Sequence, residues 1–346
     1  MMTRHLLGMA DLSDRLDETI DSAIAMKMAW MAGRTPVRGK AANAAKAAGI
    51  AKAAKADKAA KADRTDKATK TEEEALPLEG RSLGMIFEKP STRTRLSFEV
   101  GMFQLGGHAL FLSPKDMQLG RGETVADTAR VLSRYVDAIM YRAFEHKVML
   151  ELARAATVPV INALDDKEHP CQIVADLMTV KEHLGSLKGR RMAYVGDGNN
   201  VANSLALGCA MVGMDFRIGA PVGYEIDADV MDAAARYAKR TGARVESGRD
   251  PLWAVEGADV VYTDVWTSMG QEAEEAARKA IFEPYQVNPR LMAAAGPKAL
   301  FMHCLPAHRG FEVTDSVIDS KASIVLDQAE NRMHAQKQIL VDLILG

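Results

Sequence analysis

Phe87-Glu88-Lys89-Pro90-Ser91-Thr92-Arg93-Thr94-Arg95 is the stretch of the 346-residue chain that decides the fold. Residues 82–87 have the pattern of a short buried strand, and the spacing of Leu96, Val100 and Phe103 predicts that the loop opens a helix. We expect Ser91 to cap this helix, because serine is a preferred N-cap residue. Backbone N–H groups, three hydroxyls and two guanidinium groups then surround one helix N-terminus. This arrangement suits a phosphate dianion, and the alternative is an ordinary capped helix with exposed arginines.

The composition indicates a globular chain with room for two domains. Hydrophobic residues make up 48% of the sequence and charged residues 26%, and a formal charge of −2 indicates no general attraction to nucleic acid or membranes. Three cysteines cannot all pair and lack metal-site spacing, which favours a reducing compartment. No apolar run reaches spanning length, and the N-terminus is too acidic for a signal or transit peptide. We therefore expect a cytoplasmic protein without membrane association.

Residues 36–75 form an Ala/Lys-rich insertion of low complexity, with a triplet pattern from Ala53 onward. A three-residue period drifts around a helix and leaves no apolar stripe, so we predict a solvated helix or a disordered segment. Its lysines resemble the basic tails of some nucleic-acid-binding proteins. Aspartates within the segment and the glutamates at residues 72–74 dilute this charge. Nucleic-acid binding is therefore the weaker interpretation.

From residue 76 onward the predicted strands and helices alternate, which is typical of parallel sheets flanked by helices. The predicted fold class is α/β, with two domains that each hold a parallel sheet, and with the N- and C-terminal helices packing on the first domain. The strands are expected at residues 82–87, 109–112, 137–141, 158–162, 191–195, 215–219, 243–246, 258–263, 298–302 and 323–326. The expected division is 1–35 for the N-terminal helices, 36–75 for the insertion, 76–168 and 169–327 for the two domains, and 328–346 for the C-terminal helix.

Polar residues recur where the predicted strands end, which is where open parallel sheets bind ligands. Arg142, Asn199-Asn200, Asp264 and His303-Cys304 each follow or close a strand, and His169 precedes a helix that begins with a proline. Any one such residue is more often structural than catalytic, but their repetition along one edge favours an active site.

The Gly196-Asp197-Gly198 turn is an alternative signal, since a strand followed by Gly-x-Gly and a helix is typical of dinucleotide binding. Val201 occupies the third glycine position, and no acidic residue at the next strand end clearly fits a ribose. An oxidoreductase is therefore the weaker interpretation.

Four motifs resemble those of the aspartate/ornithine carbamoyltransferase family, and the match covers nearly the whole chain outside the insertion. The motifs are Ser91-Thr92-Arg93-Thr94-Arg95, His169-Pro170-Cys171-Gln172, Asp264-Val265-Trp266-Thr267-Ser268-Met269-Gly270 and His303-Cys304-Leu305-Pro306. The last two are similar to those of the ornithine branch. The resemblance implies that residues 76–168 bind carbamoyl phosphate and residues 169–327 bind ornithine. It further implies carbamoyl transfer to the δ-amine of L-ornithine, giving L-citrulline and phosphate, by a homotrimer or a multiple of trimers. It leaves open whether the role is anabolic or catabolic.

The resemblance also implies roles for individual residues, and it implies neither a metal nor an organic cofactor. The implied carbamoyl-phosphate ligands are Ser91, Thr92, Arg93, Thr94, Arg142, His169, Gln172, Cys304, Leu305 and Arg332, together with Gln118 reaching a neighbouring subunit. The implied ornithine ligands are Asn200, Asp264, Ser268 and Met269, and the implied catalytic groups are Arg142, His169, Asp264 and Cys304.

The reaction needs donors for the carbonyl oxygen, where negative charge grows in the tetrahedral intermediate. Arg142, His169 and Thr94 are suitable donors. We expect Cys304, as thiolate or hydrogen-bond acceptor, to select the neutral δ-amine with the help of Asp264. A covalent Cys304 intermediate is the less favoured alternative, because carbamoyl phosphate is already activated.

The loop at residues 268–270 and the charged stretch after it have the pattern of a lid, or alternatively of a plain surface loop. Two rival functions remain. One is carbamoyl transfer to another amine, such as putrescine or an acylated ornithine. The other is a non-catalytic scaffold that binds nucleic acid or an acidic protein through the insertion.

Overall fold

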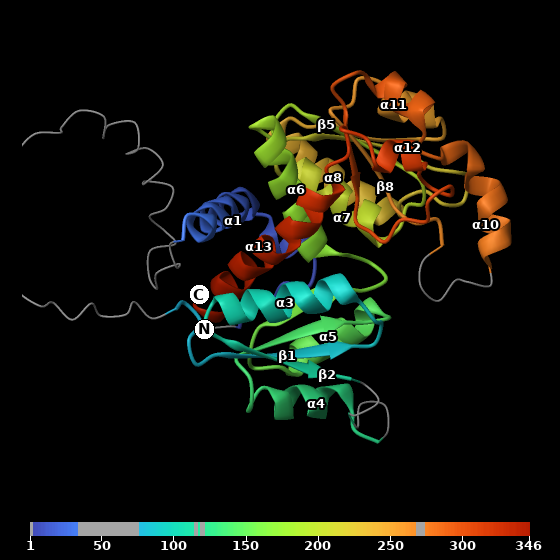
Figure 1. Ribbon diagram of the computed structural model, residues 1–346. Helices are drawn as coiled ribbons and strands as arrows, with labels where there is room; N and C mark the ends of the chain where they lie inside the picture. The colour runs from blue at the N-terminus through green and yellow to red at the C-terminus, as the bar shows by residue number, and fades with distance from the viewer. Residues whose placement is uncertain (1–2, 34–75, 114–116, 118–121, 268–273) are drawn as a thin grey trace, which may run out of the picture.

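The computed structural model describes residues 3–33, 76–113, 117, 122–267 and 274–346, which form two α/β domains joined by long helices (Figure 1). The first domain holds a four-stranded parallel sheet in the order β2-β1-β3-β4. Its strands are β1 (Ser82–Phe87), β2 (His108–Leu112), β3 (Ala138–Arg142) and β4 (Val160–Leu164). Leu6 adds an isolated parallel bridge to Ile161, so the start of the described chain lies against this sheet.

The second domain holds a five-stranded parallel sheet in the order β7-β6-β5-β8-β9. Its strands are β5 (Arg191–Val195), β6 (Asp215–Gly219), β7 (Val245–Gly248), β8 (Val260–Thr263) and β9 (Leu300–His303). The predicted fold class is thereby confirmed. No helix among the described residues combines the length and the apolar character that crossing a membrane requires.

The helices cover both faces of each sheet, as right-handed crossovers between parallel strands require. The first domain contains η1 (Met9–Leu12), α1 (Leu16–Met31), α3 (Thr92–Gln104), α4 (Val125–Leu132) and α5 (His146–Ala155). The second contains α7 (Asn200–Met211), α8 (Ala228–Thr241), α9 (Pro251–Val255), α10 (Glu275–Phe282), η4 (Glu283–Tyr285), α11 (Pro289–Ala295) and α12 (Asp315–Ile318). The remaining two, α6 (Pro170–Leu184) and α13 (Val325–Ile344), connect the domains.

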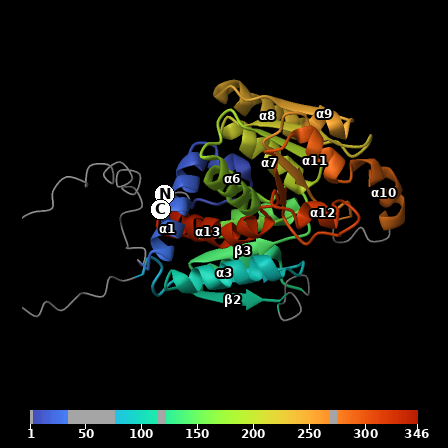
Figure 2. The same cartoon turned by 45° about the horizontal axis from the view of Figure 1, so that its top comes forward.

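One buried core runs through both domains because α6 and α13 pack between them, and each domain has a smaller core of its own on the other face of its sheet. Alternate residues of β1, such as Met85, point into this core, as do Met192 and Tyr194 of β5 in the other sheet. Helix α13 packs against α3 of the first domain and against α6, and α1 covers both α6 and α13 (Figure 2). The positions of the two sheets are therefore linked by packed helices rather than by a loop.

The apolar stripe that predicted α3 lies on its outer face. Leu96, Val100 and Phe103 are 52%, 39% and 77% exposed, whereas Phe98 and Met102 are buried in the core. The helix is where the spacing placed it, but the stripe does not face the interior of this chain.

One local prediction was wrong, and three short helices were not predicted. Residues 323–326 are not a strand, because Ser323 makes only an isolated bridge to Phe301 and α13 already begins at Val325. The short helices α9, α11 and α12 were not predicted, since segments of four to seven residues carry little periodicity.

Candidate active site

The predicted site residues follow the central strands of both sheets, at the points where the strand order reverses. In the first sheet, β2 and β3 lie on opposite sides of β1, so residues 88–94 and Arg142 lie beside the switch point. In the second sheet, β6 and β8 flank β5, which places Asn199 and Asp264 beside the corresponding point. Such crevices are where open α/β sheets bind ligands.

A cavity of about 840 Å³ lies between these two edges. Its walls include every predicted site residue that the structure describes. These are Ser91, Thr92, Arg93, Thr94, Arg142, His169, Gln172, Asn200, Asp264, Cys304, Leu305 and Arg332. Gln118, Ser268 and Met269 lie outside the described residues, as does the predicted loop at 268–270. A cavity of this volume accommodates two small substrates.

The wall built on the first domain is the N-terminus of α3. The Ser91 Oγ accepts a hydrogen bond from the Thr94 N–H at 3.2 Å, so Ser91 is the N-cap as predicted. The next N–H groups of the helix and the half-buried Arg93 line the cavity. Backbone donors, the helix dipole and a guanidinium group together favour an anion at this end.

Two further donors in the same wall have unused hydrogen-bonding atoms. Arg142 is 8% exposed and His169 is 4% exposed, and Arg142 Nε and His169 Nδ1 have no partner among the described residues. Burial, with Arg332 and Arg142 nearby, holds the pKa of His169 well below its usual value, so the imidazole is neutral. Burial and the neighbouring guanidinium groups lower the pKa of Arg142 to about 10, which leaves it charged at neutral pH. One cationic and one neutral donor therefore border the cavity.

Arg332 links the two domains from α13. Its Nη1 donates to Gln172 Oε1 on α6 at 2.5 Å, and its Nη2 donates to the Thr94 hydroxyl on α3 at 3.3 Å. Arg332 Nε remains without a partner in the described part of the chain. The side chain is 3% exposed, so its position is fixed by these contacts.

A buried carboxylate beneath Gln172 holds this arrangement. Asp176 accepts hydrogen bonds from Gln172 Nε2 at 2.7 Å, Gln328 Nε2 at 2.7 Å and the Tyr262 hydroxyl at 3.0 Å. Because its amide nitrogen is engaged, Gln172 turns its oxygen towards Arg332. Gln328 similarly turns its oxygen to the backbone N–H of His303 at 3.0 Å. One carboxylate thus orients groups on both sides of the cavity.

The opposite wall carries Asp264 and Cys304. The Cys304 thiol donates to Asp264 Oδ1 at 3.0 Å, and Asn199 Nδ2 donates to Asp264 Oδ2 at 2.8 Å. Burial, together with the adjacent Asp264 carboxylate, raises the pKa of Cys304 well above its usual value. In this structure Cys304 is therefore a thiol and a hydrogen-bond donor. The predicted thiolate or acceptor is corrected in that respect, because burial and Asp264 raise the pKa of Cys304 by more than Arg93 lowers it.

The turn after β9 fixes the position of Cys304. The Leu305 N–H donates to His303 Nδ1 at 2.8 Å, so His303 Nε2 carries the proton and donates to Glu312 Oε1 at 3.1 Å. Leu305 has a φ of +58°, a conformation that costs a non-glycine residue about 1–2 kcal/mol. This strain and the buried His303–Glu312 pair indicate that the turn is held in place for function.

The same region offers the donor atoms of a metal site. Asp264, His303 and Cys304 each place one ligand atom within 4.8 Å of the others. Both ring nitrogens of His303 are, however, already engaged with Leu305 and Glu312. We therefore interpret the group as a hydrogen-bonded network that positions Cys304.

Comparison with known proteins decides the family. Residues 4–182 match the family described as "Aspartate/ornithine carbamoyltransferase, carbamoyl-P binding domain", and residues 188–343 match "Aspartate/ornithine carbamoyltransferase, Asp/Orn binding domain". This chain belongs to the aspartate/ornithine carbamoyltransferase family.

Individual relatives within this carbamoyltransferase family are similar over most of the chain. The ornithine carbamoyltransferase of Bacillus subtilis is 61% identical over 261 residues, which are 75% of this chain and 82% of the relative. The anabolic ornithine carbamoyltransferase of Pyrococcus furiosus is 59% identical over 269 residues, 78% and 85% of the two chains. A solved structure of ornithine carbamoyltransferase from Pyrococcus furiosus has a TM-score of 0.86 at 48% identity and covers 100% of this chain and 98% of its own.

Family resemblance and strand-end reasoning did not find every residue of the site. Asn200, predicted to bind ornithine, donates its Nδ2 to the Asp165 carbonyl at 2.6 Å, whereas its neighbour Asn199 contacts Asp264. Asp176 was not predicted, although an acidic residue in the apolar stretch of α6 was a usable signal.

The Gly196-Asp197-Gly198 turn has a packing explanation. A Cβ at Gly198 would collide with the backbone of Glu225 and Ile226, so glycine is required by this close approach. The signal therefore needs no dinucleotide.

Proposed function

We propose that the chain transfers the carbamoyl group of carbamoyl phosphate to the δ-amine of L-ornithine, giving L-citrulline and phosphate. The observation that carries the proposal is a single cavity with the α3 N-terminus, Arg93 and Arg142 on one wall and Asp264 with Cys304 on the other. The first wall fits a phosphate, and the second fits an amine. The names of the relatives supply ornithine, and the description of the family that matches residues 4–182 supplies carbamoyl phosphate.

Carbamoyl phosphate binds at the first wall in this proposal. Its phosphate accepts hydrogen bonds from the N–H groups of α3, from the hydroxyls of residues 91, 92 and 94, and from Arg93. Its carbonyl oxygen faces Arg142 and the neutral His169, with Thr94 nearby. These donors stabilise the negative charge that develops on the oxygen, and each contributes about 3 kcal/mol in comparable sites.

Ornithine binds at the second wall, with Asn200, Asp264, Ser268 and Met269 as proposed ligands. The Asp264 carboxylate, oriented by Asn199, accepts hydrogen bonds from ornithine N–H groups, and Cys304 contacts the reacting δ-amine. Gln172, Leu305 and Arg332 complete the carbamoyl end, and Gln118 serves the cavity of a neighbouring subunit.

The reaction then proceeds by direct attack. The lone pair of the neutral δ-amine forms the N–C bond, and the carbonyl electrons move to oxygen. Collapse of the tetrahedral intermediate breaks the C–O bond to phosphate, and the proton lost by the amine is carried away on the phosphate. Alignment of two substrates in one cavity supplies much of the acceleration.

We also propose a homotrimer, or a multiple of trimers, in the cytoplasm. The exposed apolar stripe of Leu96, Val100 and Phe103 on α3 supports an interface there, and Leu110 and Phe111 of the edge strand β2 are 40% and 39% exposed beside it. Three free cysteines fit a reducing compartment. A solution mass equal to that of the monomer would contradict the assembly.

Domain roles and metabolic direction complete the proposal. We assign carbamoyl-phosphate binding to residues 76–168 together with the helices at 1–35 and 328–346, and ornithine binding to residues 169–327. We propose arginine biosynthesis as the direction, which fits the relative named anabolic, whereas a second relative is named catabolic.

The test compares three amines, ornithine, putrescine and acetylornithine, as acceptors for carbamoyl phosphate. We expect citrulline from ornithine at a kcat/KM well above the values for the other two amines. If ornithine gives no product and another amine does, the substrate assignment is wrong, although the reaction class is retained. The absence of transfer to all three would refute the reaction class itself.

A further inference from the structure

Helix α10 has an unusual buried face. Of its eight residues, Glu275–Phe282, only Arg278 and Phe282 are buried, at 4% and 0% exposure. Arginine is seldom buried unless it is paired. The buried contacts of the helix with the second domain are therefore made by one charged and one aromatic side chain, and the exposed Lys279 adds a cation–π contact with Phe311.

The Arg278 guanidinium group contacts two separate loops. Its Nε donates to the Trp266 carbonyl at 2.5 Å, and its Nη2 donates to Asp197 Oδ2. The Tyr224 and Phe282 rings lie 4.7 and 5.3 Å from the guanidinium carbon and cover the group. These contacts fix the guanidinium plane and shield the ion pair from water.

These are the loops that carry the proposed ornithine-binding side chains. Asp197 comes two residues before Asn199 in the turn after β5, and Trp266 comes two residues after Asp264, beyond β8. The loops are thus joined twice, by the Asn199–Asp264 hydrogen bond and by Arg278.

We propose that Arg278 is a positioning residue for the amine substrate, which acts by holding the Asp197 turn and the Asp264 loop at a fixed separation. The inference rests on the proposed function, because it concerns the ornithine half of the cavity. Without the guanidinium group, Asp197 loses its cation and the Trp266 carbonyl loses its donor. Among the described residues, the two loops then keep the Asn199–Asp264 hydrogen bond as their one remaining link, and the oxygens of Asp264 are less firmly oriented.

The carbamoyl-phosphate half has no hydrogen bond to Arg278 among the described residues. Arg142 and Arg332 are fixed from β3 and α13, and Arg93 lies on α3 of the other domain. Loss of Arg278 is therefore expected to weaken ornithine binding and to leave carbamoyl-phosphate binding unchanged. A residue that only docks α10 would affect both substrates alike or neither.

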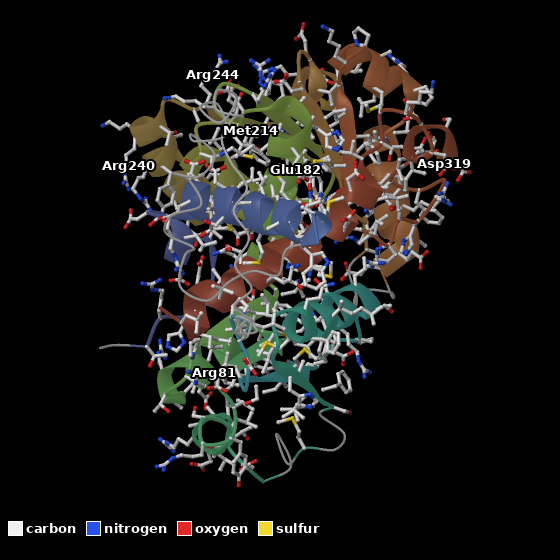
Figure 3. All side chains as sticks on the ribbon, turned by 60° about the vertical axis from the view of Figure 1, so that its left-hand side comes forward. Arg81, Glu182, Met214, Arg240, Arg244 and Asp319 are labelled. Carbon is white, nitrogen blue, oxygen red and sulfur yellow. The ribbon has the colours of Figure 1, made fainter. Side chains whose placement is uncertain are left out.

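The experiment uses Arg278→Met, which keeps length without charge, and Arg278→Lys, which keeps the charge but cannot reach both acceptors with a planar group. Arg244→Met is the matched control. Arg244 pairs with Asp215 at 2.7 Å in the same domain, at the opposite end of the strands, and lies far from the first domain (Figure 3). Circular dichroism verifies that each variant is folded.

Two readouts are compared. One is the KM of each substrate in the citrulline assay. The other is the Kd of L-2-aminopentanoate, which is ornithine without the δ-amine and so cannot react, in the presence of carbamoyl phosphate. The second readout separates the two proposals: binding of the analogue by a wild-type protein that makes no citrulline would refute the proposed function and still test Arg278.

We expect Arg278→Met to raise the ornithine KM and the analogue Kd by about 10- to 100-fold, since small misplacements of binding groups have effects of this order. Carbamoyl-phosphate binding should be unchanged, Arg278→Lys should be intermediate, and Arg244→Met should match the wild type. Asp197→Asn should add little to Arg278→Met, because both changes break one interaction. The proposal is overturned if Arg278→Met leaves the analogue Kd at the control value, or weakens both substrates equally.

Discussion

Asp176→Asn tests the buried network that joins the two halves of the cavity. Asp176 is fully buried on α6, where its carboxylate accepts hydrogen bonds from Gln172, Gln328 and Tyr262. Burial raises the pKa of this carboxyl from 3.8 to about 6, and the three hydrogen bonds offset only part of that cost. A pKa difference of about 2 corresponds to a free energy of about 3 kcal/mol.

The sign of the pH dependence follows from the direction of the shift. The folded protein retains the Asp176 proton at pH values where the unfolded chain has lost it, because the folded pKa is about 6 and the unfolded value is 3.8. This contribution to stability is complete below the unfolded pKa and is lost as the pH rises through the folded pKa. Asparagine does not titrate. As the pH rises from 3 to 7, the free energy of unfolding of the variant should therefore increase by about 3 kcal/mol relative to that of the wild type. About half of this change should occur above pH 5.

Asparagine also changes the hydrogen bonding. Its amide nitrogen cannot accept from the Tyr262 hydroxyl, and a buried donor left without a partner costs about 1–3 kcal/mol. At pH 7 the cost of the unpaired hydroxyl roughly offsets the free energy gained by not burying a charged carboxylate. The two proteins should therefore have similar stability at that pH. At pH 5 the variant should be clearly the less stable protein.

The assay is denaturant unfolding at pH 5, 6 and 7 and one fixed protein concentration, since assembly makes stability concentration-dependent. Asp232→Asn, at an exposed position on α8, is the matched control. If the difference between wild type and Asp176→Asn stays constant with pH, the pKa of Asp176 is not raised and the reasoning fails. Steady-state kinetics on the same variant should show a lower kcat/KM for both ornithine and carbamoyl phosphate, because Gln172 and Gln328 lose their charged common acceptor.

Three further changes test the roles proposed for Arg93, Cys304 and residues 40–70. Arg93→Ala should raise the Kd of carbamoyl phosphate by about 10- to 100-fold, measured by calorimetry, because a charge-assisted hydrogen bond to phosphate is removed. Cys304→Ser should mainly lower kcat/KM for ornithine while leaving that Kd unchanged, and equal effects of both variants on carbamoyl-phosphate binding would overturn the division. Deletion of residues 40–70 should retain citrulline formation, whereas the scaffold hypothesis predicts instead that binding to nucleic acid or an acidic protein is lost.

Local patterns predicted the parts of the site that depend on short stretches of chain. The Ser91 cap is specified by one residue at a helix start, and Arg142, Asp264 and Cys304 follow from the rule that ligands lie beyond the carboxyl ends of parallel strands. Each inference needs only the strand and the residues that follow it. For this reason these residues could be predicted from short stretches of sequence, and the structure places them around one cavity.

Contacts between distant segments were not predictable in this way. Gln328 reaches Asp176 across 152 positions of sequence, and no periodicity relates the two. The stripe of Leu96, Val100 and Phe103 was likewise not fully predictable, because helical spacing identifies an apolar face without identifying what packs against it. A stripe exposed on the monomer is typical of an interface, and that conclusion requires the burial of the opposite face to be known first.

The buried polar groups of α6 and α13 have a functional explanation that packing alone does not give. Replacing buried charges by apolar residues often stabilises a protein, so Asp176 and Arg332 are poor choices for holding two helices together. They do, however, connect Thr94 of the first domain with the His303 backbone of the second through directional hydrogen bonds. Apolar contacts would permit small sliding between the helices. A network of fixed donors and acceptors instead sets the separation of a phosphate site and an amine site, and attack of the amine on the carbonyl carbon depends on that separation.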